Sequence, residues 1–512
     1  MKKSLFTSGL LFLVFLGLVS FQRGSNQYVV QFRTPGMPPL DGRSTNLIDQ
    51  VNAFQLDGVS PDQNVVAGLY EVAKLRDLRY HDSTHVQIKS LENALGIQIP
   101  MDPKTIISLG QRTFDWIDDW IVLSNEDPIL RRYLARHQQT LDQIATIVDR
   151  PHYANYYYSD KPNFIAVHLP LAGSNRQCAR ILNLRARVAL GEDRLFDAIT
   201  DASLIYRLAG HMASGGACLV EGLVGGSLIK EKEFMKTWSE ILSHPDLTVD
   251  DLERISTLLK ADPPITGAKG LDIGDRLVPH QLASYLEKYG SAGIRRIEPN
   301  VRDDVQRSDP LLAFVDWQEI HKRIDQKMDE ALDVLSASDE QERRTRIRKM
   351  RARAENKFSF RKDFSFFNVP ALATDFTWKI IDDLLLFYNP VYLETIELAR
   401  DQQEVLRVCI ELKRFHFEKQ RYPSSLDELL GKYLDHIPLD YWTGKPIRYL
   451  RLKAGALVYT VGRNEVDDGG WPYDAGGFNA DVVFLLGHDD RSPPGGLSSP
   501  LADDTRPQDQ TR

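Results

Sequence analysis

Apolar residues recur at steps of three and four along most of this chain, which is the period of an amphipathic helix. The pattern predicts helices at Pro103 to Ser124 and at Pro128 to Val148, and several more between Gly173 and Leu259. The polar stretch from Asp316 to Arg353 predicts one long helix. Because neighbouring helices of this kind pack as hairpins, we expect a mainly α-helical protein.

The pattern changes in the last quarter of the chain, where one long helix is followed by strands. Apolar residues on one face predict a helix from Val391 to Glu418. Tyr422 precedes Pro423, and the helix ends there because a residue before proline leaves the helical region. Ser425 and Glu428 predict a capping box for a short second helix. Three apolar runs predict strands at Ile447 to Leu452, Leu457 to Val461 and Asp481 to Leu486.

These elements predict a mainly α fold: a helical (helix-hairpin) region followed by a small α+β domain with a short antiparallel sheet. Prolines and a glycine in Thr34 to Pro39 exclude a helix and predict an extended linker. The end of the chain is rich in Pro, Ser, Asp and Gly, and we expect it to be disordered. The predicted parts are a signal peptide or anchor at 1–24, a linker at 25–60, a helical domain at 61–388 with a sub-boundary near 160–172, the α+β domain at 389–487 and the tail at 488–512.

The chain opens with a basic head, Met1 to Lys3, and an uncharged apolar run, Leu5 to Phe21. This order predicts an export signal. Ser20 could precede a cleavage site, but the run also approaches the length of a membrane span, so a single transmembrane helix is the slightly favoured alternative. Either alternative predicts that the bulk of the chain lies outside the cytoplasm, anchored in the cell membrane by its N-terminal segment or exported.

Composition places few further limits on function. The chain has 512 residues, 42% of them hydrophobic, and a net charge of -8, which suits folded domains with apolar cores. The mild acidity gives no whole-chain signal for nucleic acid. Cys178, Cys218 and Cys409 are too few for a disulfide framework. Cys178 and Cys218 could pair, although small buried apolar residues are the favoured interpretation.

The order of motifs near the C-terminus resembles a known family. The long helix, the Tyr-Pro exit, the Leu-rich short helix, the turn Pro438 to Gly444 and the small sheet are together similar to the globular domain of major pseudopilins of type II secretion systems. The chain departs from that family because its apolar run holds no glutamate and lies far from the long helix, so filament assembly is not implied. The whole chain resembles exported bacterial proteins, and that resemblance implies no activity.

The resemblance also implies a structural calcium ion in the acidic loop before the last strand. Calcium takes several oxygen ligands from carboxylates and loop carbonyls, and Gly469 and Gly470 let the backbone turn inward. An ordinary acidic turn without a metal is the open alternative. Carried over position by position, the candidate ligands are Asp467, Asp468, Asp474 and, more weakly, Asp481.

No motif identifies a catalytic set. The chain has no G-x-S-x-G elbow and no phosphate-binding glycine loop. His81 and His85 have the spacing of a metal pair on a helix, but no third ligand is near them in the sequence, so incidental histidines are favoured. Carboxylates that could serve glycoside hydrolysis are Glu233 and Glu240, or Asp115, Asp118 and Asp119, although such residues are common on helices.

Three functional hypotheses remain open. The first is a non-enzymatic envelope protein that mediates protein contacts, in a secretion-related role. The second is an envelope hydrolase acting on a glycan or peptide in the helical domain. The third is binding of a membrane surface or polyanion by the basic stretch Arg343 to Lys357, for which a solvated helix face is the favoured structural explanation. The sequence identifies neither a partner nor an oligomeric state.

Overall fold

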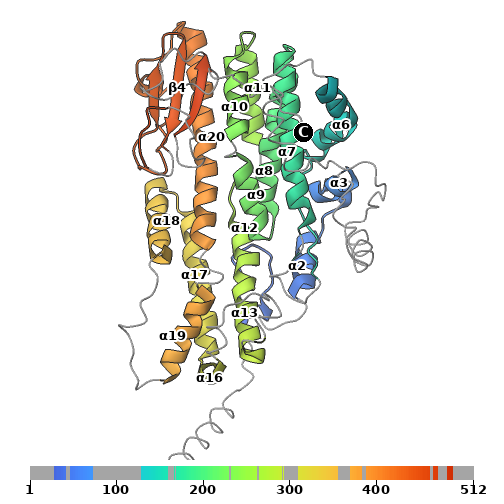
Figure 1. Ribbon diagram of the computed structural model, residues 1–512, viewed down its shortest axis with the longest axis vertical. Coiled ribbons are helices and arrows are strands. Elements are labelled where there is room, and N and C mark those ends of the chain that lie inside the picture. Colours follow the sequence, from blue (N-terminus) through green and yellow to red (C-terminus); the bar gives the residue numbers. More distant parts are fainter. Residues whose placement is uncertain are drawn as a thin grey trace, which may run out of the picture. The chain divides into compact units, whose positions relative to one another are not determined.

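The computed structural model confirms a mainly α-helical protein with a small three-stranded antiparallel sheet near the C-terminus (Figure 1). The chain divides into two compact units. We call Met1–Leu184, Leu204–Ile229 and Asp262–Ala399 the helical body, and Arg185–Ser203, Lys230–Ala261 and Arg400–Arg512 the C-terminal unit. The structure describes residues 28–41, 47–72, 128–159, 167, 169–229, 232–261, 265–290, 292, 309–355, 369–382, 388–461, 465–470 and 481–487.

The first described segment is packed structure and not the extended linker that the sequence predicts. Strands β1 (Val29–Val30) and β2 (Leu40–Asp41) pair antiparallel, and helix α2 (Leu47–Leu56) follows. Met37 and Leu40 are buried against α2 and against residues of later helices in one apolar cluster. Burial of apolar surface therefore overrides the effect of the prolines, which shape a turn between the two strands.

The helical body contains the helices expected from the apolar period, while the predicted helix at 103–124 lies outside the described residues. Helices α7 and α8 each cross a boundary between the two units. The first described helices are the 3-10 turn η1 (Pro61–Gln63), α3 (Val65–Val72), α6 (Pro128–Ile147), α7 (Pro170–Gly191), α8 (Leu195–Gly215) and α9 (Leu219–Ile229). The later ones are α16 (Asp309–Leu312), α17 (Trp317–Ser336), α18 (Glu340–Glu355) and α19 (Val369–Ile381).

One continuous helical stretch was not predicted. It consists of α12 (Ala268–Gly270), the π-helical turn η3 (Leu271–Asp275) and α13 (Arg276–Tyr289). Proline inside a helix removes one backbone hydrogen bond, and a π-turn is a usual accommodation. Here Pro279 lies inside α13 just after the π-turn, so a stretch rich in helix breakers remains helical.

The predicted helix from Asp316 to Arg353 is two helices. Ala337 is extended and ends α17, and the carboxylate of Asp339 then accepts a hydrogen bond of 2.7 Å from the backbone N–H of Glu342 at the start of α18. Asp339 is therefore a capping residue. The sequence pattern missed the break because polar residues are compatible with both a helix interior and a helix start.

The basic stretch of α18 is only partly the solvated face that the sequence favours: Lys349 and Arg353 are exposed, but other basic side chains pair within the protein. Arg343 Nε donates to Glu397 Oε1 at 2.6 Å, and Arg351 pairs with Glu394. Both glutamates lie on α20 (Tyr388–Lys419), and Arg344 is buried beside Glu340. Ion pairs to the first part of α20 therefore hold α18 within the helical body.

The predicted transmembrane helix needs correction. Among the described residues, which begin at Tyr28, no helix is long and apolar enough to cross a membrane. This finding contradicts the predicted single-span membrane protein and its location in the cell membrane. The run Leu5 to Phe21, on which that prediction rested, lies outside the described residues, as does the tail at 488–512.

The C-terminal unit combines helices and the sheet. Helices α10 (Lys232–Ser243) and α11 (Val249–Ala261) belong to it, together with the second part of α20. The sheet has the order β3 (Arg448–Arg451), β4 (Gly455–Thr460), β5 (Val482–Gly487), which confirms the three predicted strands to within a few residues. Strand β4 is central and entirely buried, and α10 packs against β5.

Two turns connect α20 to the sheet. The short predicted helix is a 3-10 turn, η5 (Leu426–Leu429), and its capping box is shifted by one residue because Glu428 accepts from Ser424 instead of Ser425. Asp440 is buried and accepts four hydrogen bonds, from the backbone N–H groups of Trp442, Thr443 and Val461 and from the Arg448 guanidinium. Asp440 thus stabilises the predicted turn and ties it to the sheet.

Candidate functional site

The structure places three of the four predicted calcium ligands at the end of the C-terminal sheet. Asp467 and Asp468 lie in the loop after β4, and Asp481 immediately precedes β5. Asp474 lies outside the described residues. Asp467 and Asp468 lie close enough to Asp481 for their charges to help raise its pKa.

Asp467 already has partners inside the protein. Its carboxylate accepts from Arg448 Nε at 2.6 Å, from the Tyr459 hydroxyl at 3.1 Å and from the backbone N–H of Gly469 at 3.0 Å. Burial opposes ionisation of Asp467, but the Gly469 and Arg448 hydrogen bonds prevail and hold the pKa of Asp467 below its usual value. Asp467 therefore supports the loop and has little capacity left for a metal ion.

Asp481 is the unusual residue of the site. It is only 1% exposed, and Oδ2 accepts a hydrogen bond from the backbone N–H of Gly470 at 2.8 Å. Its other oxygen, Oδ1, is buried and has no hydrogen-bond partner among the described residues. Burial, reinforced by Asp468 and Asp467 and opposed by the Gly470 amide, raises the pKa of Asp481 to about 6. Within the described part of the chain, an ionised Asp481 therefore has no cation paired with it.

The loop backbone is shaped to reach Asp481. Gly469 and Gly470 both have positive φ, +74° and +70°, a conformation that glycine adopts without strain. A Cβ at Gly470 would lie 2.2 Å from Leu457 Cδ2, so the chain passes too close to the sheet for any side chain. This close approach brings the Gly470 amide to the carboxylate of Asp481.

The same unit has a groove beside strand β5. Its cavity volume is about 520 Å³. One wall is α10, and the other is β5 with Asp481 at its start. The residues that line it are Met235, Lys236, Ser239, Glu240, Ser243, Asp481, Val482, Val483, Leu485 and Gly487.

Two serines of α10 cover part of the free edge of β5. Ser239 Oγ accepts from the backbone N–H of Leu485 at 3.3 Å, while Ser243 Oγ donates to the Leu485 carbonyl and accepts from the Gly487 amide. Backbone groups of an edge strand face outward at every second residue. Val483 therefore points its N–H and C=O toward the groove, where no described residue is shown to pair with them.

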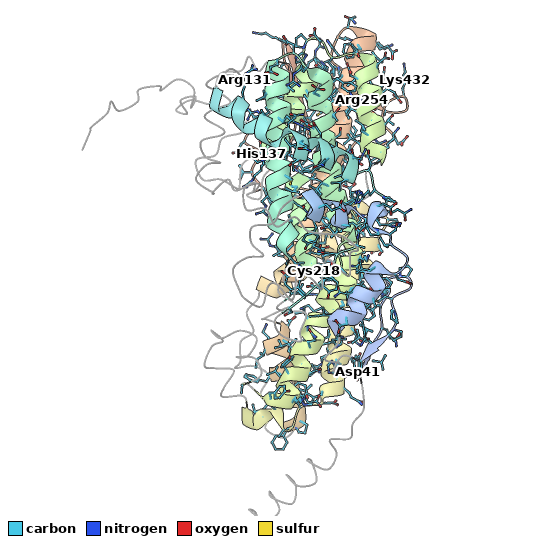
Figure 2. The ribbon with its side chains drawn as sticks, turned by 90° about the vertical axis from the view of Figure 1, so that its right-hand side faces the viewer. Asp41, Arg131, His137, Cys218, Arg254 and Lys432 are labelled. Atoms are coloured by element: carbon cyan, nitrogen blue, oxygen red, sulfur yellow. The ribbon has the colours of Figure 1, made fainter. Side chains whose placement is uncertain are left out.

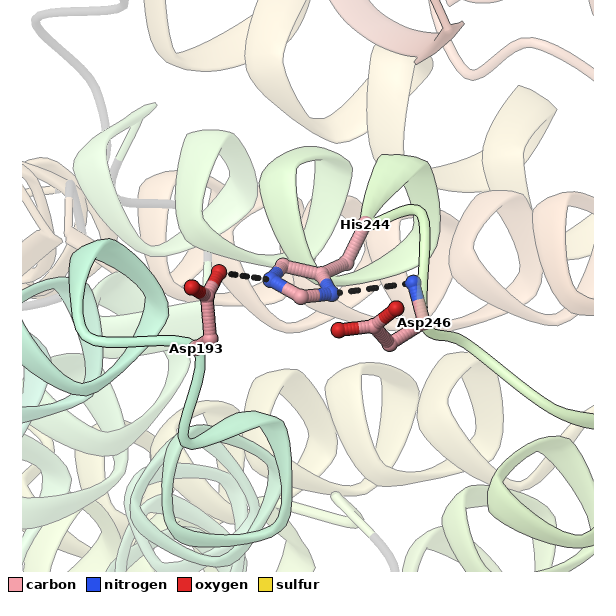
Figure 3. A group of neighbouring side chains, drawn as sticks. All are labelled: Asp193, His244 and Asp246. Carbon is pink, nitrogen blue, oxygen red and sulfur yellow. Dashed lines mark hydrogen bonds and ion pairs between the residues drawn. The ribbon is translucent and has the colours of Figure 1, made fainter.

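A third cluster lies at the turns that follow α7 and α10, and Figure 3 shows its side chains converging. It consists of Asp193, His244 and Asp246, each of which offers one ligand atom within 4.8 Å of the others. His244 Nε2 lies 3.5 Å from Asp193 Oδ1, and the backbone N–H of Asp246 donates to His244 Nδ1 at 3.3 Å. No sequence pattern indicates this cluster, because Asp193 and the other two residues come from distant segments.

Glu221 in the helical body is buried and fully occupied. Oε1 accepts from the Tyr153 hydroxyl at 3.2 Å and Asn155 Nδ2 at 2.8 Å, and Oε2 accepts from the Tyr157 hydroxyl at 2.5 Å. Burial raises the pKa of Glu221 against these three hydrogen bonds. Burial likewise lowers the pKa of Lys269 to about 8. Since all of its contacts are internal, Glu221 fixes the segment from Tyr153 to Tyr157, which precedes α7, to helix α9.

A second buried network surrounds Arg276, whose side chain is 1% exposed. Its guanidinium contacts Asp272 at 3.0 Å, Asp325 at 2.8 Å and Asp329 at 2.7 Å. His280 Nε2 lies 3.1 Å from Asp325. Burial would raise the pKa of Asp325, but hydrogen bonds from His280 and Arg276 outweigh it and lower that pKa to about 2. The protein supplies its own cation here.

The same network ties down the first strand. Asp272 Oδ2 accepts from the backbone N–H groups of Arg33 at 2.8 Å and Thr34 at 2.6 Å. The Tyr28 ring stacks on His321 with the ring centroids 4.7 Å apart. These contacts explain why the segment after residue 27 is packed, and they give the buried charges a structural role.

The cysteines agree with the favoured interpretation from the sequence. All three are free; Cys178 and Cys409 are buried, and Cys218, which is labelled in Figure 2, is half-buried. Burial raises the pKa of the Cys178 thiol to about 12, so the thiol stays protonated at neutral pH. The predicted candidates outside the described residues are His81, His85, Asp115, Asp118, Asp119 and the side chain of Glu233.

Comparison with known proteins found no relative from which a role for these residues could be inferred. No protein-family model, no curated protein and no solved structure was found to match the chain. The resemblance to pseudopilins therefore stays a prediction that rests on the order of motifs in the C-terminal unit.

Proposed function

We propose that the protein mediates protein contacts through its C-terminal unit, and that calcium holds the acidic loop of that unit. The observation that carries this proposal is the position of Asp481. Its buried Oδ1 has no partner among the residues that the structure describes, and Asp481 immediately precedes the strand that forms one wall of the groove. A cation at Asp481 would thus stabilise both the loop and the binding surface.

The donor set suits a hard cation. Asp481 and Asp468 offer carboxylate oxygens, and the turn at Gly469 and Gly470 holds the Asp481 carboxylate in place through the Gly470 N–H. Calcium takes six to eight such oxygens and tolerates irregular geometry, whereas magnesium demands a regular octahedron. Arg448 engages Asp467, which we therefore assign to the support of the loop. Asp474 remains a predicted ligand.

Thermal unfolding with calcium, magnesium or a chelator tests the metal. We expect calcium to raise the unfolding midpoint of the wild type and to lose this effect in Asp481→Asn and Asp468→Asn, because a ligand that binds only the folded state stabilises it. Asp435→Asn, at an exposed carboxylate of the same unit, is the matched control and should respond as the wild type does. An unchanged midpoint of the wild type in calcium would remove the metal from the proposal.

An extended polypeptide segment is the partner chemistry that suits the groove. Val483 offers a backbone donor and acceptor on the free edge of β5, and valine and methionine side chains supply apolar contact. A segment that adds beside an edge strand gains backbone hydrogen bonds and places alternate side chains in the groove. Lys236 and Glu240 on α10 would add charge selectivity.

Val483→Pro tests this contact directly. Proline removes the N–H that faces the groove and leaves the ladder to β4 intact, because proline is tolerated where an edge strand faces outward. Peptides selected from a displayed library on the wild type should bind this variant at least about tenfold more weakly. They should bind Arg451→Ala, on the opposite edge strand, unchanged. Failure to enrich any peptide, or equal binding to Val483→Pro, would contradict the groove as the contact surface.

Hydrolysis is the second candidate, because two carboxylates line the groove. Asp481 has a pKa of about 6, in the range of a general acid, and Glu240 lies 3.5 Å from the Arg187 guanidinium. Paired carboxylates are the usual means of glycoside hydrolysis. Turnover of aryl glycosides or peptides that disappears in Glu240→Gln would favour this candidate over contact alone.

A further inference from the structure

We propose that Asp193, His244 and Asp246 bind a divalent transition-metal ion of the zinc class. The three residues come from two turns of the C-terminal unit, the one between α7 and α8 and the one between α10 and α11. One imidazole nitrogen and two carboxylate oxygens are ligands that zinc accepts, and the two negative charges balance a divalent ion. The site shares no residue with the acidic loop, so it stands independently of the proposed calcium ion.

The position of the imidazole suits a ligand. The His244 side chain is only 8% exposed, and both ring nitrogens make long contacts: Nδ1 accepts the Asp246 backbone N–H at 3.3 Å, and Nε2 lies 3.5 Å from Asp193 Oδ1. Because Nδ1 accepts, the proton of a neutral imidazole is on Nε2. A metal at Nε2 takes the place of this proton, which moves to Nδ1, and only the long contact to Asp246 is lost.

The carboxylates are free to complete the site. The Asp193 side chain is 81% exposed, and no ion pair or hydrogen bond of the Asp246 carboxylate is seen among the described residues. The nearby cation Arg194 is engaged by Glu192 and Asp197 and does not compete for Asp193. Zinc lies about 2.0–2.2 Å from oxygen and nitrogen ligands. The ligand atoms of the three residues lie within 4.8 Å of one another, so small rotations of the exposed side chains would bring all three to one ion.

The coordination number indicates the kind of site. Three protein ligands leave at least one position for water, as in open zinc sites, whereas closed structural sites use four. The presence of an imidazole distinguishes this site from the acidic loop, where all the offered atoms are oxygens. We therefore expect zinc, cobalt or nickel to prefer the His244 site and calcium to prefer Asp481.

Cobalt(II) is a suitable probe because its visible absorption reports the ligand field. The full chain, freed of metal with a chelator, should bind one cobalt ion and then release it to zinc. His244→Gln and Asp246→Asn should each weaken this binding at least about tenfold, since each removes a ligand. His436→Ala, at an exposed histidine of the same unit, and Asp481→Asn should bind cobalt as the wild type does.

The outcomes separate the two sites. Cobalt binding that is lost in the His244 and Asp246 variants and kept in both controls supports the proposal. A wild type that shows no cobalt absorption overturns it, as do His244→Gln and Asp246→Asn proteins that bind cobalt unchanged. If Asp481→Asn abolishes cobalt binding while His244→Gln retains it, the ion belongs to the acidic loop and the proposal is equally wrong.

Discussion

Two groups of three aspartates in this protein have opposite electrostatic environments. In the helical body, Asp272, Asp325 and Asp329 surround the buried guanidinium of Arg276. In the C-terminal unit, Asp467 and Asp468 lie near Asp481, and among the described residues the cation that pairs with the group is Arg448, which contacts Asp467. The pKa of Asp325 is lowered to about 2, and that of Asp481 is raised to about 6.

The difference shows what an acidic cluster needs before it suggests a ligand. Carboxylates that pair with a cation of the protein itself need no external ligand, whatever their number. A buried carboxylate without one has an unmet electrostatic requirement, which protonation or an external cation can satisfy. On this basis the cluster around Arg276 carries no proposal, and the cluster at Asp481 does.

The largest expected effect comes from removing the internal cation. Arg276→Met leaves three carboxylates together without their partner, which should lower the free energy of unfolding by about 3–5 kcal/mol. Arg353→Met is the matched control, because that side chain is 71% exposed and its pair with Glu330 is worth less than about 1 kcal/mol. Urea denaturation followed by circular dichroism measures both. Equal losses would mean that the buried network is not held by Arg276.

Asp481→Asn should have effects of opposite sign with and without calcium. Without the ion, the change removes a buried unpaired charge and should stabilise the C-terminal unit by about 1–3 kcal/mol. In saturating calcium the same change removes a ligand, so the variant should be less stable than the wild type. Urea denaturation in chelator and in calcium measures the reversal. The same sign in both conditions would show that Asp481 does not respond to calcium.

The two regions should also respond oppositely to pH. Asp325, with a pKa lowered to about 2, contributes stability above its unfolded pKa of about 3.9, and this contribution is lost as the pH falls toward 2. Asp481, with a pKa raised to about 6, contributes most below pH 4 and loses that contribution as the pH rises through 6. Calorimetry in chelator from pH 3 to 8 should show both trends, and Asp481→Asn should abolish only the second.

The sequence predicted elements better than it predicted their contacts. The long helix α20 and the three strands follow from periodicity and from the Tyr422-Pro423 stop. The helix through Pro279 was missed because a π-turn next to a proline has no simple sequence pattern. The packing of the segment after Tyr28 was missed for another reason, since its partners lie on helices far along the chain.

The candidate sites show the same limit. The acidic loop was predicted from its motif order, but the burial of Asp481 depends on its place beside β5 and on the loop at Gly470. Ser239 and Ser243 are four residues apart and therefore lie on one face of α10. This spacing indicates a contact with β5 only once β5 is known to lie beside that face. His244 has no such signal, because its partner Asp193 is contributed by another turn.

The smallest expected effect distinguishes the contribution of the loop's backbone turn from that of its carboxylates. Gly470→Ala places a Cβ against Leu457 at positive φ, whereas Gly444→Ala has a positive φ of 65° but nothing within 4 Å. The left-handed conformation alone disfavours alanine by about 1–2 kcal/mol in both variants, so the excess loss in Gly470→Ala, about 1 kcal/mol, measures the close approach. If the turn prepares Asp481 for calcium, Gly470→Ala should also weaken the calcium-induced rise in unfolding midpoint, and Gly444→Ala should not. Equal calcium responses would assign the site to its carboxylates alone, because a cation could then organise the loop without the preformed turn.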